Sequence, residues 1–184
     1  MNFLKTLLKN KMRKLLIASL ITIVLLFLTS CTSDDDNSSS NDTLSGTWKL
    51  TAFNSSTAYD LNNDGNASVN LLDELDCLEN ETLVFGSNNT VVSNNTSFID
   101  LEIGLVVGTT DQFTFVVDCE EDVYSFSLTY TRNGNTIIFN DDGDLLQGTV
   151  SGNALSFVLE EEIDVADENG LSTTEDITIV YNRQ

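Results

Sequence analysis

Residues 124–140 read YSFSLTYTRNGNTIIFN, and this stretch is the strongest indication of the fold. Its first seven residues alternate large apolar side chains with serine and threonine, which is the period of a strand with one buried face. The pair Asn133-Gly134 follows, and both residue types favour the positive φ angles of a tight hairpin turn. A second apolar stretch, 136–140, comes directly after this turn. The stretch therefore predicts a β-hairpin.

The same alternation recurs along most of the chain. Turn signals rich in Asn, Asp, Gly and Ser separate the alternating segments at 87–89, 141–144 and 151–153. About eight strands joined by short turns predict an all-β, antiparallel up-and-down meander, which removes its exposed edges best by closing into a barrel. The further expected strands are 47–53, 82–86, 90–103, 112–118, 145–151, 154–160 and 177–181.

One segment, SVNLLDELDCL, breaks the alternation. Leu71, Leu75 and Leu78 recur at spacings of four and three, which is the apolar stripe of a short helix. Asn70, with Asp73 three residues later, resembles a capping arrangement at its start. We therefore expect one short helix after the first strand.

The first thirty residues have the pattern of a secretory signal. Residues 1–14 carry five of the eight Lys and Arg, and 15–28 are a run that is apolar except for Ser19 and Thr22. This run is shorter than the about 20 residues of a membrane span, so a signal peptide over 1–30 is expected. Its end, LTSC, resembles the lipobox of bacterial lipoproteins, which implies a covalent lipid on Cys31 after cleavage. The alternative is an ordinary signal peptide followed by a chance cysteine.

Residues 31–43 follow as a flexible acidic tether, because nothing in TSDDDNSSSNDT can build a core. Asp34, Asp35 and Asp36 resemble the acidic export signal of surface lipoproteins of Bacteroidota. This resemblance implies a lipid-anchored protein of the outer membrane that faces the medium. In the alternative, the acids only solvate the tether and the protein faces the periplasm. Residues 44–184 then form one domain.

Charge limits the partners of the mature chain. Without residues 1–30, three basic residues (Lys49, Arg132 and Arg183) stand against 29 acidic ones, a formal charge of −26. Binding of nucleic acid requires clustered Lys and Arg, so it is excluded. Acyl chains, not charge, must attach such a chain to a membrane. The acidity suits divalent cations or a cationic partner.

The cysteines and the missing histidine limit the chemistry. After lipidation of Cys31, Cys77 and Cys119 remain, and outside the cytoplasm such a pair predicts a disulfide. Two buried free thiols are the alternative. The chain has no histidine, which excludes Ser-His and Cys-His nucleophiles and argues against zinc. Carboxylate pairs, as in glycosidases, remain available, but clusters arise by chance among 29 acids. We expect no enzymatic activity.

Residues 60–66, DLNNDGN, match the first half of an EF-hand calcium loop. Oxygen side chains at alternate positions can converge on one cation, because Gly65 lets the backbone turn sharply. The twelfth position, normally a bidentate Glu, is Leu71, and Glu74 is the expected substitute. A surface turn built from Asn, Asp and Gly is the alternative. The expected ligands of a structural Ca²⁺ are Asp60, Asn62, Asp64, Asn66 and Glu74.

The domain opens with LSGTWKL, residues 44–50, and its Gly46-x-Trp48 resembles the G-x-W signature of lipocalins. In that family the tryptophan closes one end of an eight-stranded barrel under an arginine from near the end of the chain. The resemblance implies that Arg183 is this partner. A guanidinium over an indole contributes on the order of 1 kcal/mol.

The whole arrangement is most similar to the lipocalin-like domain lipoproteins of Bacteroidota. They share the lipobox, the L-x-G-x-W-x-L opening, an Asp/Asn/Gly loop, a leucine-rich helix near a cysteine, and hairpins with NGN or DG turns. This resemblance implies a lipocalin-like barrel that holds a small apolar or amphipathic ligand. The alternative is a structural surface lipoprotein that binds an envelope protein partner and has a filled core without a ligand.

Overall fold

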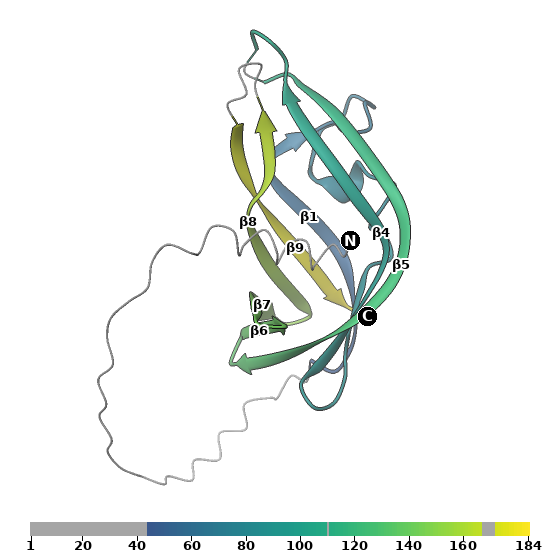
Figure 1. Ribbon diagram of the computed structural model, residues 1–184, viewed down its shortest axis with the longest axis vertical. Helices are drawn as coiled ribbons and strands as arrows, with labels where there is room; N and C mark the ends of the chain where they lie inside the picture. The colour runs from purple at the N-terminus through teal and green to yellow at the C-terminus, as the bar shows by residue number, and fades with distance from the viewer. Residues whose placement is uncertain (1–43, 110, 167–171) are drawn as a thin grey trace, which may run out of the picture.

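The computed structural model describes residues 44–109, 111–166 and 172–184, and these residues are nearly all in β-strands (Figure 1). The expected signal peptide, the lipidated Cys31 and the acidic tether lie outside the described residues. The elements are β1 (Gly46–Tyr59), β2 (Ser68–Asn70), the 3₁₀ turn η1 (Leu71–Asp73), β3 (Thr82–Phe85), β4 (Thr90–Leu105), β5 (Phe113–Asn133), β6 (Thr136–Asp141), β7 (Asp144–Ser151), β8 (Ala154–Ala166) and β9 (Ser172–Arg183).

The strands close into an antiparallel barrel. From β3 to β9 each strand pairs with the next one in the chain, and β1 pairs with both β3 and β9. Eight strands therefore form the barrel, and the short β2 adds to the edge of β1. The predicted antiparallel up-and-down barrel of about eight strands is confirmed.

The predicted hairpin forms between β5 and β6. Asn133 pairs with Thr136, so the two turn residues are Gly134 and Asn135. The turn is thus shifted by one residue from the Asn133-Gly134 pair. Gly134 has a φ of +59°, a conformation that glycine adopts without the penalty of a Cβ atom. Tyr130 lies opposite Phe139, and their apolar rings pack on the same face.

Two of the expected strands are one strand in the structure. The segments 112–118 and 124–130 belong to β5, which spans 21 residues and pairs with β4 from Thr129 back to Phe113. The acidic residues between them hid this continuity, because they are exposed and show no alternation. The long β4–β5 pair forms the right-hand wall in Figure 1.

The expected short helix is wrong: η1 is a single 3₁₀ turn. Leu71, Leu75 and Leu78 are all buried, but an irregular segment places them in the core. Leu78 has a φ of +67°, which ends any helix, and its backbone N–H donates to Ser97 Oγ at 2.7 Å. This tertiary contact outweighs helix propensity, since so short a helix is costly to nucleate. Asn70 makes no cap and instead accepts a hydrogen bond from the Phe53 N–H.

Trp48 lies in the core, where 1% of its surface is exposed. Its indole Nε1 donates to the Leu44 carbonyl at 2.8 Å, so burial leaves no polar atom of the ring unpaired. The β1–β9 register puts Arg183 directly opposite Trp48, and the guanidinium donates to the Ser45 carbonyl. The two residues are therefore cross-strand neighbours at the closure of the barrel. The stacking of the guanidinium on the indole stays a prediction.

Candidate functional site: a side opening in the barrel wall

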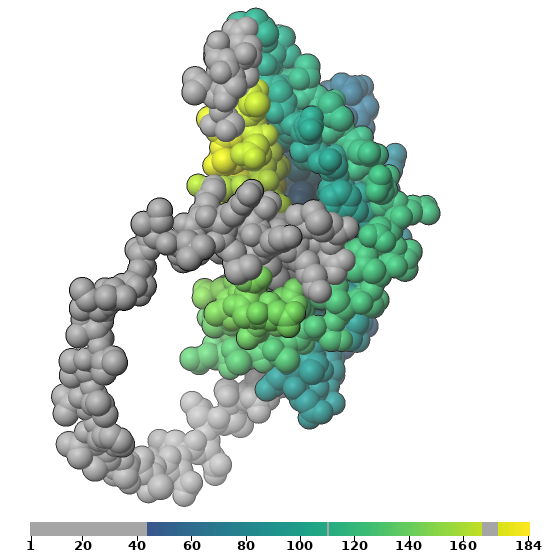
Figure 2. Space-filling view, in the orientation of Figure 1, coloured from purple at the N-terminus to yellow at the C-terminus, as the bar shows by residue number. Residues whose placement is uncertain are grey.

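In the described part of the chain, the wall of the barrel is incomplete between β5 and β8. The two strands that lie between β5 and β8 in the sheet, β6 and β7, are short. On its β5 side, β6 pairs with residues 129–133, and on its β8 side, β7 pairs with residues 154–157. Among the described strands, residues 113–128 of β5 pair with β4 alone. Farther along, β8 turns onto β4, where Val165 and Ala166 pair in parallel with Ile103 and Gly104. Figure 2 shows a recess between the yellow strands and the teal β4–β5 pair, with dark blue atoms of β1 inside it.

Aromatic side chains line the inner face beside this opening. In the β4–β5 ladder, Val91 lies opposite Leu128, and both are almost fully buried, so this face points inward. Tyr124 and Phe126 share that face, and their stacked rings lie 6.1 Å apart. Both remain partly exposed, as does Tyr181 of β9. The barrel therefore presents an accessible aromatic lining from within.

The inner face of β4 is polar where the core would be expected to be apolar. Ser93, Asn95 and Ser97 are all buried on it. The Ser93 hydroxyl donates to Asn95 Oδ1 at 3.2 Å, and the Asn95 amide nitrogen has no hydrogen-bond partner. Buried polar groups without partners are rare in proteins, so this donor requires an explanation.

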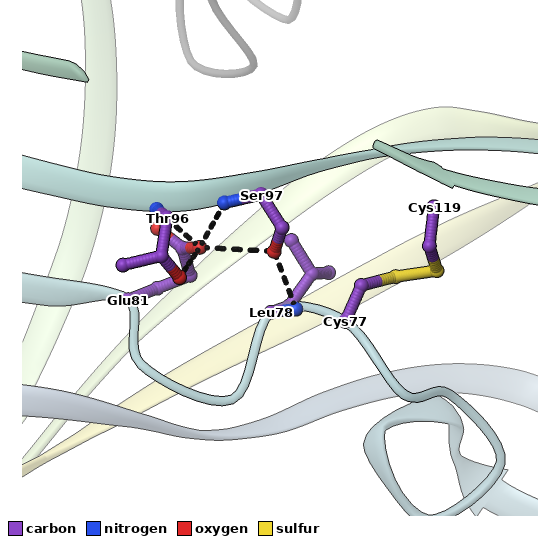
Figure 3. Close-up of a disulfide and its surroundings, with 6 residues drawn as sticks. All are labelled: Cys77, Leu78, Glu81, Thr96, Ser97 and Cys119. Atoms are coloured by element: carbon purple, nitrogen blue, oxygen red, sulfur yellow. Dashed lines mark hydrogen bonds between the residues drawn. A yellow bond between two sulfur atoms is a disulfide. The ribbon is translucent and has the colours of Figure 1, made fainter. Parts of the chain in front are cut away.

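A buried carboxylate, Glu81, lies beside this polar stretch (Figure 3). Its Oε1 accepts the backbone N–H groups of Thr96 at 2.8 Å and Ser97 at 3.1 Å, and both hydroxyls as well. The β4–β5 register is irregular between Asn95 and Ser97, which frees two successive amides for one oxygen. Oε2 of Glu81 has no partner. We call Glu81, Ser93, Asn95, Ser97 and Tyr181 the polar floor.

Tyr181 joins the polar floor from β9. Burial raises the pKa of its phenol far above the usual range, and the nearby Glu81 carboxylate and Tyr124 raise the pKa further. The Tyr181 hydroxyl therefore keeps its proton throughout the physiological range and can donate a hydrogen bond. The polar floor thus combines a carboxylate, two serine hydroxyls, an amide and a protonated phenol.

A second hollow lies on the outer face, where β8 meets the β4–β5 pair. This groove has a volume of about 500 Å³ and is lined by three carboxylates, those of Glu102, Glu162 and Asp164. Gly104 lies on its floor, where a Cβ would come within 2.7 Å of Thr114 Oγ1. Burial raises the pKa of Glu162 to about 7, and the charge of Asp164 contributes to the rise.

The predicted disulfide is present between Cys77 and Cys119, whose Cα atoms are 5.8 Å apart. It ties the irregular segment after η1 to the middle of β5 (Figure 3). This attachment lies close to the Leu78 and Glu81 contacts with β4. The disulfide therefore secures the segment that carries Glu81.

The predicted calcium loop folds around its own side-chain oxygens. Asp60 accepts the N–H groups of Asp64 at 2.9 Å and Gly65 at 3.0 Å, and Asn62 also accepts the Asp64 N–H. Asp64 accepts the N–H of Asn66 at 2.7 Å. The substitute ligand, Glu74, is buried and its Oε2 has no partner.

Among residues 44–109, 111–166 and 172–184, no three or more His, Cys, Asp or Glu side chains are grouped so that they could hold a metal ion. Calcium also takes amide and backbone carbonyl oxygens, so this does not test the loop. The loop stays a predicted calcium site.

Sequence reasoning did not find the polar floor, although a signal was present. Ser93, Asn95 and Ser97 occupy every second position of the expected strand 90–103, between Val91 and Ile99 on the apolar face. Polar residues at core positions of a strand indicate either a functional lining or a buried network. Comparison of the chain with models of protein families, with curated proteins and with solved structures gives no match. Only the geometry of the barrel therefore indicates what the protein does.

The disulfide generates the first prediction. Replacement of both Cys77 and Cys119 by Ser should lower the free energy of unfolding by about 4 kcal/mol, because the bridge closes a loop of 42 residues in the unfolded chain. Urea unfolding with and without reductant measures the effect. Reductant should destabilise the parent protein and leave the double variant unchanged. Equal stability of the oxidised parent and the variant would contradict the prediction.

Glu162 generates a second prediction, on pH. Its pKa rises from the ordinary 4.5 to about 7 in the folded chain, so between these values the unfolded chain loses the proton first. The free energy of unfolding then falls as the pH increases from about 5 to 7. Glu162→Gln should raise Tm near pH 8 by on the order of 5 °C and change it little near pH 4. The exposed Glu79→Gln is the matched control, and an equal shift at both pH values for Glu162→Gln would refute the assignment.

Proposed function

We propose that this protein is a lipid-anchored, non-catalytic envelope lipoprotein that holds a small apolar or amphipathic ligand inside its barrel. The observation that carries the proposal is the accessible aromatic lining at the side opening, formed by Tyr124, Phe126 and Tyr181. Ligand sites are generally concave, mostly apolar and equipped with a few polar groups. The side opening has this composition, since the aromatic lining borders the polar floor.

The size of the barrel agrees with this proposal. Eight strands leave an interior that side chains can fill or that can accept one small ligand. Here β6 and β7 end early, so the interior has a lateral entrance. A ligand could enter through the recess without opening any strand pair.

The anchor completes the proposal. The lipobox ending at Cys31 and the acidic tether support a protein that is held in the outer membrane by its acyl chains and faces the medium. In the part of the chain that the structure describes, no helix is long and apolar enough to cross a membrane.

The ligand is tested by mass spectrometry of the small molecules extracted from natively purified protein. We expect one class of apolar or amphipathic compound at near-stoichiometric amount. The double variant Tyr124→Ser, Phe126→Ser should lose most of it, because the aromatic lining is removed. Val123→Ser is the control on the same strand, since Val123 is 82% exposed. Folded parent protein that never yields a small molecule would refute ligand binding.

A partner-binding role is the second candidate. It is favoured by residues 113–128 of β5, which pair with β4 alone among the described strands. Residues 113–128 offer backbone donors and acceptors along one side, where an extended peptide can add as a further strand. In this alternative, natively purified protein would bring down an envelope protein and contain no small molecule. The same purification therefore separates the two candidates.

We also propose that the 60–66 loop is a calcium clasp beside the barrel, with Asp60, Asn62, Asp64, Asn66 and Glu74 as its ligands. The side-chain oxygens of Asp60 and Asn62, which already curl the loop around Gly65, support this proposal. A chelator should then lower Tm, and Asp60→Ala or Asp64→Ala should abolish the difference. Asp142→Ala, in the β6–β7 turn, should keep it. An unchanged Tm on chelation of the parent protein would exclude the clasp.

A further inference from the structure

We propose that the polar floor is a head-group subsite, selective for ligands whose polar end donates hydrogen bonds and carries no negative charge. This inference rests on the proposed function, because it requires a ligand that enters through the side opening. It adds the chemical class of the ligand. An amphiphilic alcohol or amine fits this subsite, and a fatty-acid anion does not.

One carboxylate oxygen of Glu81 has no hydrogen-bond partner. Only 3% of this residue is exposed, and four donors from Thr96 and Ser97 all converge on Oε1. Oε2 is left without any donor among the described residues. A buried carboxylate oxygen without a donor is costly, and a ligand hydroxyl or ammonium would satisfy it.

Two hydrogen-bond donors, from Asn95 and Tyr181, lie near the Glu81 carboxylate. The amide nitrogen of Asn95 is buried and has no acceptor. The Tyr181 phenol remains protonated, since burial and the neighbouring Glu81 both oppose its ionisation. A hydroxyl group both donates and accepts, so it can satisfy Glu81 and Asn95 together. The polar floor thus matches a neutral hydroxyl best and a cationic amine next.

The polar floor contains no basic side chain that could neutralise a bound carboxylate. Lys49 alternates with the buried Trp48 and Leu50, so it points to the opposite face of β1. Arg132 donates to the Gly134 carbonyl at the far hairpin, and Arg183 donates to Ser45. No other basic residue occurs in the mature chain. A carboxylate ligand would therefore be buried beside the Glu81 charge without compensation, which is strongly unfavourable.

The aromatic lining supplies the other half of the site. Tyr124 and Phe126 lie on the same face as Asn95 and Ser93 and directly opposite them in the ladder. A ligand with its head on the polar floor therefore lays its apolar chain along these rings. This arrangement makes the head group the part of the ligand that decides affinity among molecules of equal chain length.

The test uses three ligands of one chain length: decanol, decylamine and decanoate, each below its micelle concentration. Because the barrel closes and buries its core within residues 44–184, the chain is tested without residues 1–31. Displacement of a neutral naphthylamine fluorophore at neutral pH reports binding. We expect decanol and decylamine to displace the fluorophore at about tenfold lower concentration than decanoate. This tenfold gap in displacing concentration corresponds to the contribution of one charge-assisted hydrogen bond.

Glu81→Gln should narrow this gap to about twofold, because the like charge is removed and the amine loses its partner. The exposed Glu79→Gln should leave the gap unchanged, and Tyr181→Phe should weaken decanol binding without reversing the order. If Glu81→Gln does not fold, the order of the three ligands on the parent protein still tests the inference. Equal or tighter binding of decanoate to the parent protein would overturn the head-group inference and leave the proposed function standing. Failure of the fluorophore and all three ligands to bind would overturn both.

Discussion

Pairing between β1 and β9 holds the barrel closed. It joins the first and last strands of the domain, with Trp48 opposite Arg183 and Leu50 opposite Tyr181. This ladder turns a meander with two exposed edges into a closed barrel. It also brings Tyr181 to the inner face, where the charge of the nearby Glu81 carboxylate helps to raise the pKa of the Tyr181 phenol. Closure of the barrel therefore adds Tyr181 to the polar residues that the β3–β4 hairpin already holds together.

Strand length explains why a closed barrel still has an entrance. The β4–β5 and β8–β9 pairs are long, whereas β6 and β7 span six and eight residues. The short pair can close only one end, and the long pairs continue beyond it until β8 meets β4. Gly148 supports this tight end, because a Cβ there would come within 2.5 Å of the Phe157 ring. The wall is therefore open where β5 and β8 extend beyond the ends of β6 and β7.

The irregularity in the β4–β5 ladder gives the interior its chemistry. In a regular strand the N–H groups of Thr96 and Ser97 would point to opposite edges, but here both donate to one oxygen of Glu81. The cost of burying this carboxylate is offset by four donors and by the disulfide that secures the preceding segment. Glu81 thus has one satisfied and one open oxygen.

Local pattern was enough for several features of this protein. The alternation in 124–140 predicted the β5–β6 hairpin, the strands and turns predicted the barrel, and the cysteine count predicted the Cys77–Cys119 disulfide. These features depend on side-chain period, turn chemistry and pairing of a small number of residues, all of which are local or countable. The leucine spacing misled, because the Leu78 contact with Ser97 replaced the helix that the stripe predicted.

Composition and side-chain period, read from the sequence alone, are enough to identify residues 44–184 as an acidic β domain without histidine and with three basic residues, because both properties are local to the chain. That Glu81, Asn95 and Tyr181 lie in one interior follows only from the arrangement of the strands in space. The β3–β4 hairpin places Glu81 beside Asn95, and closure of the barrel adds Tyr181 from the last strand. Their proximity depends on register and curvature, which are set by long-range strand pairing and leave no local signal.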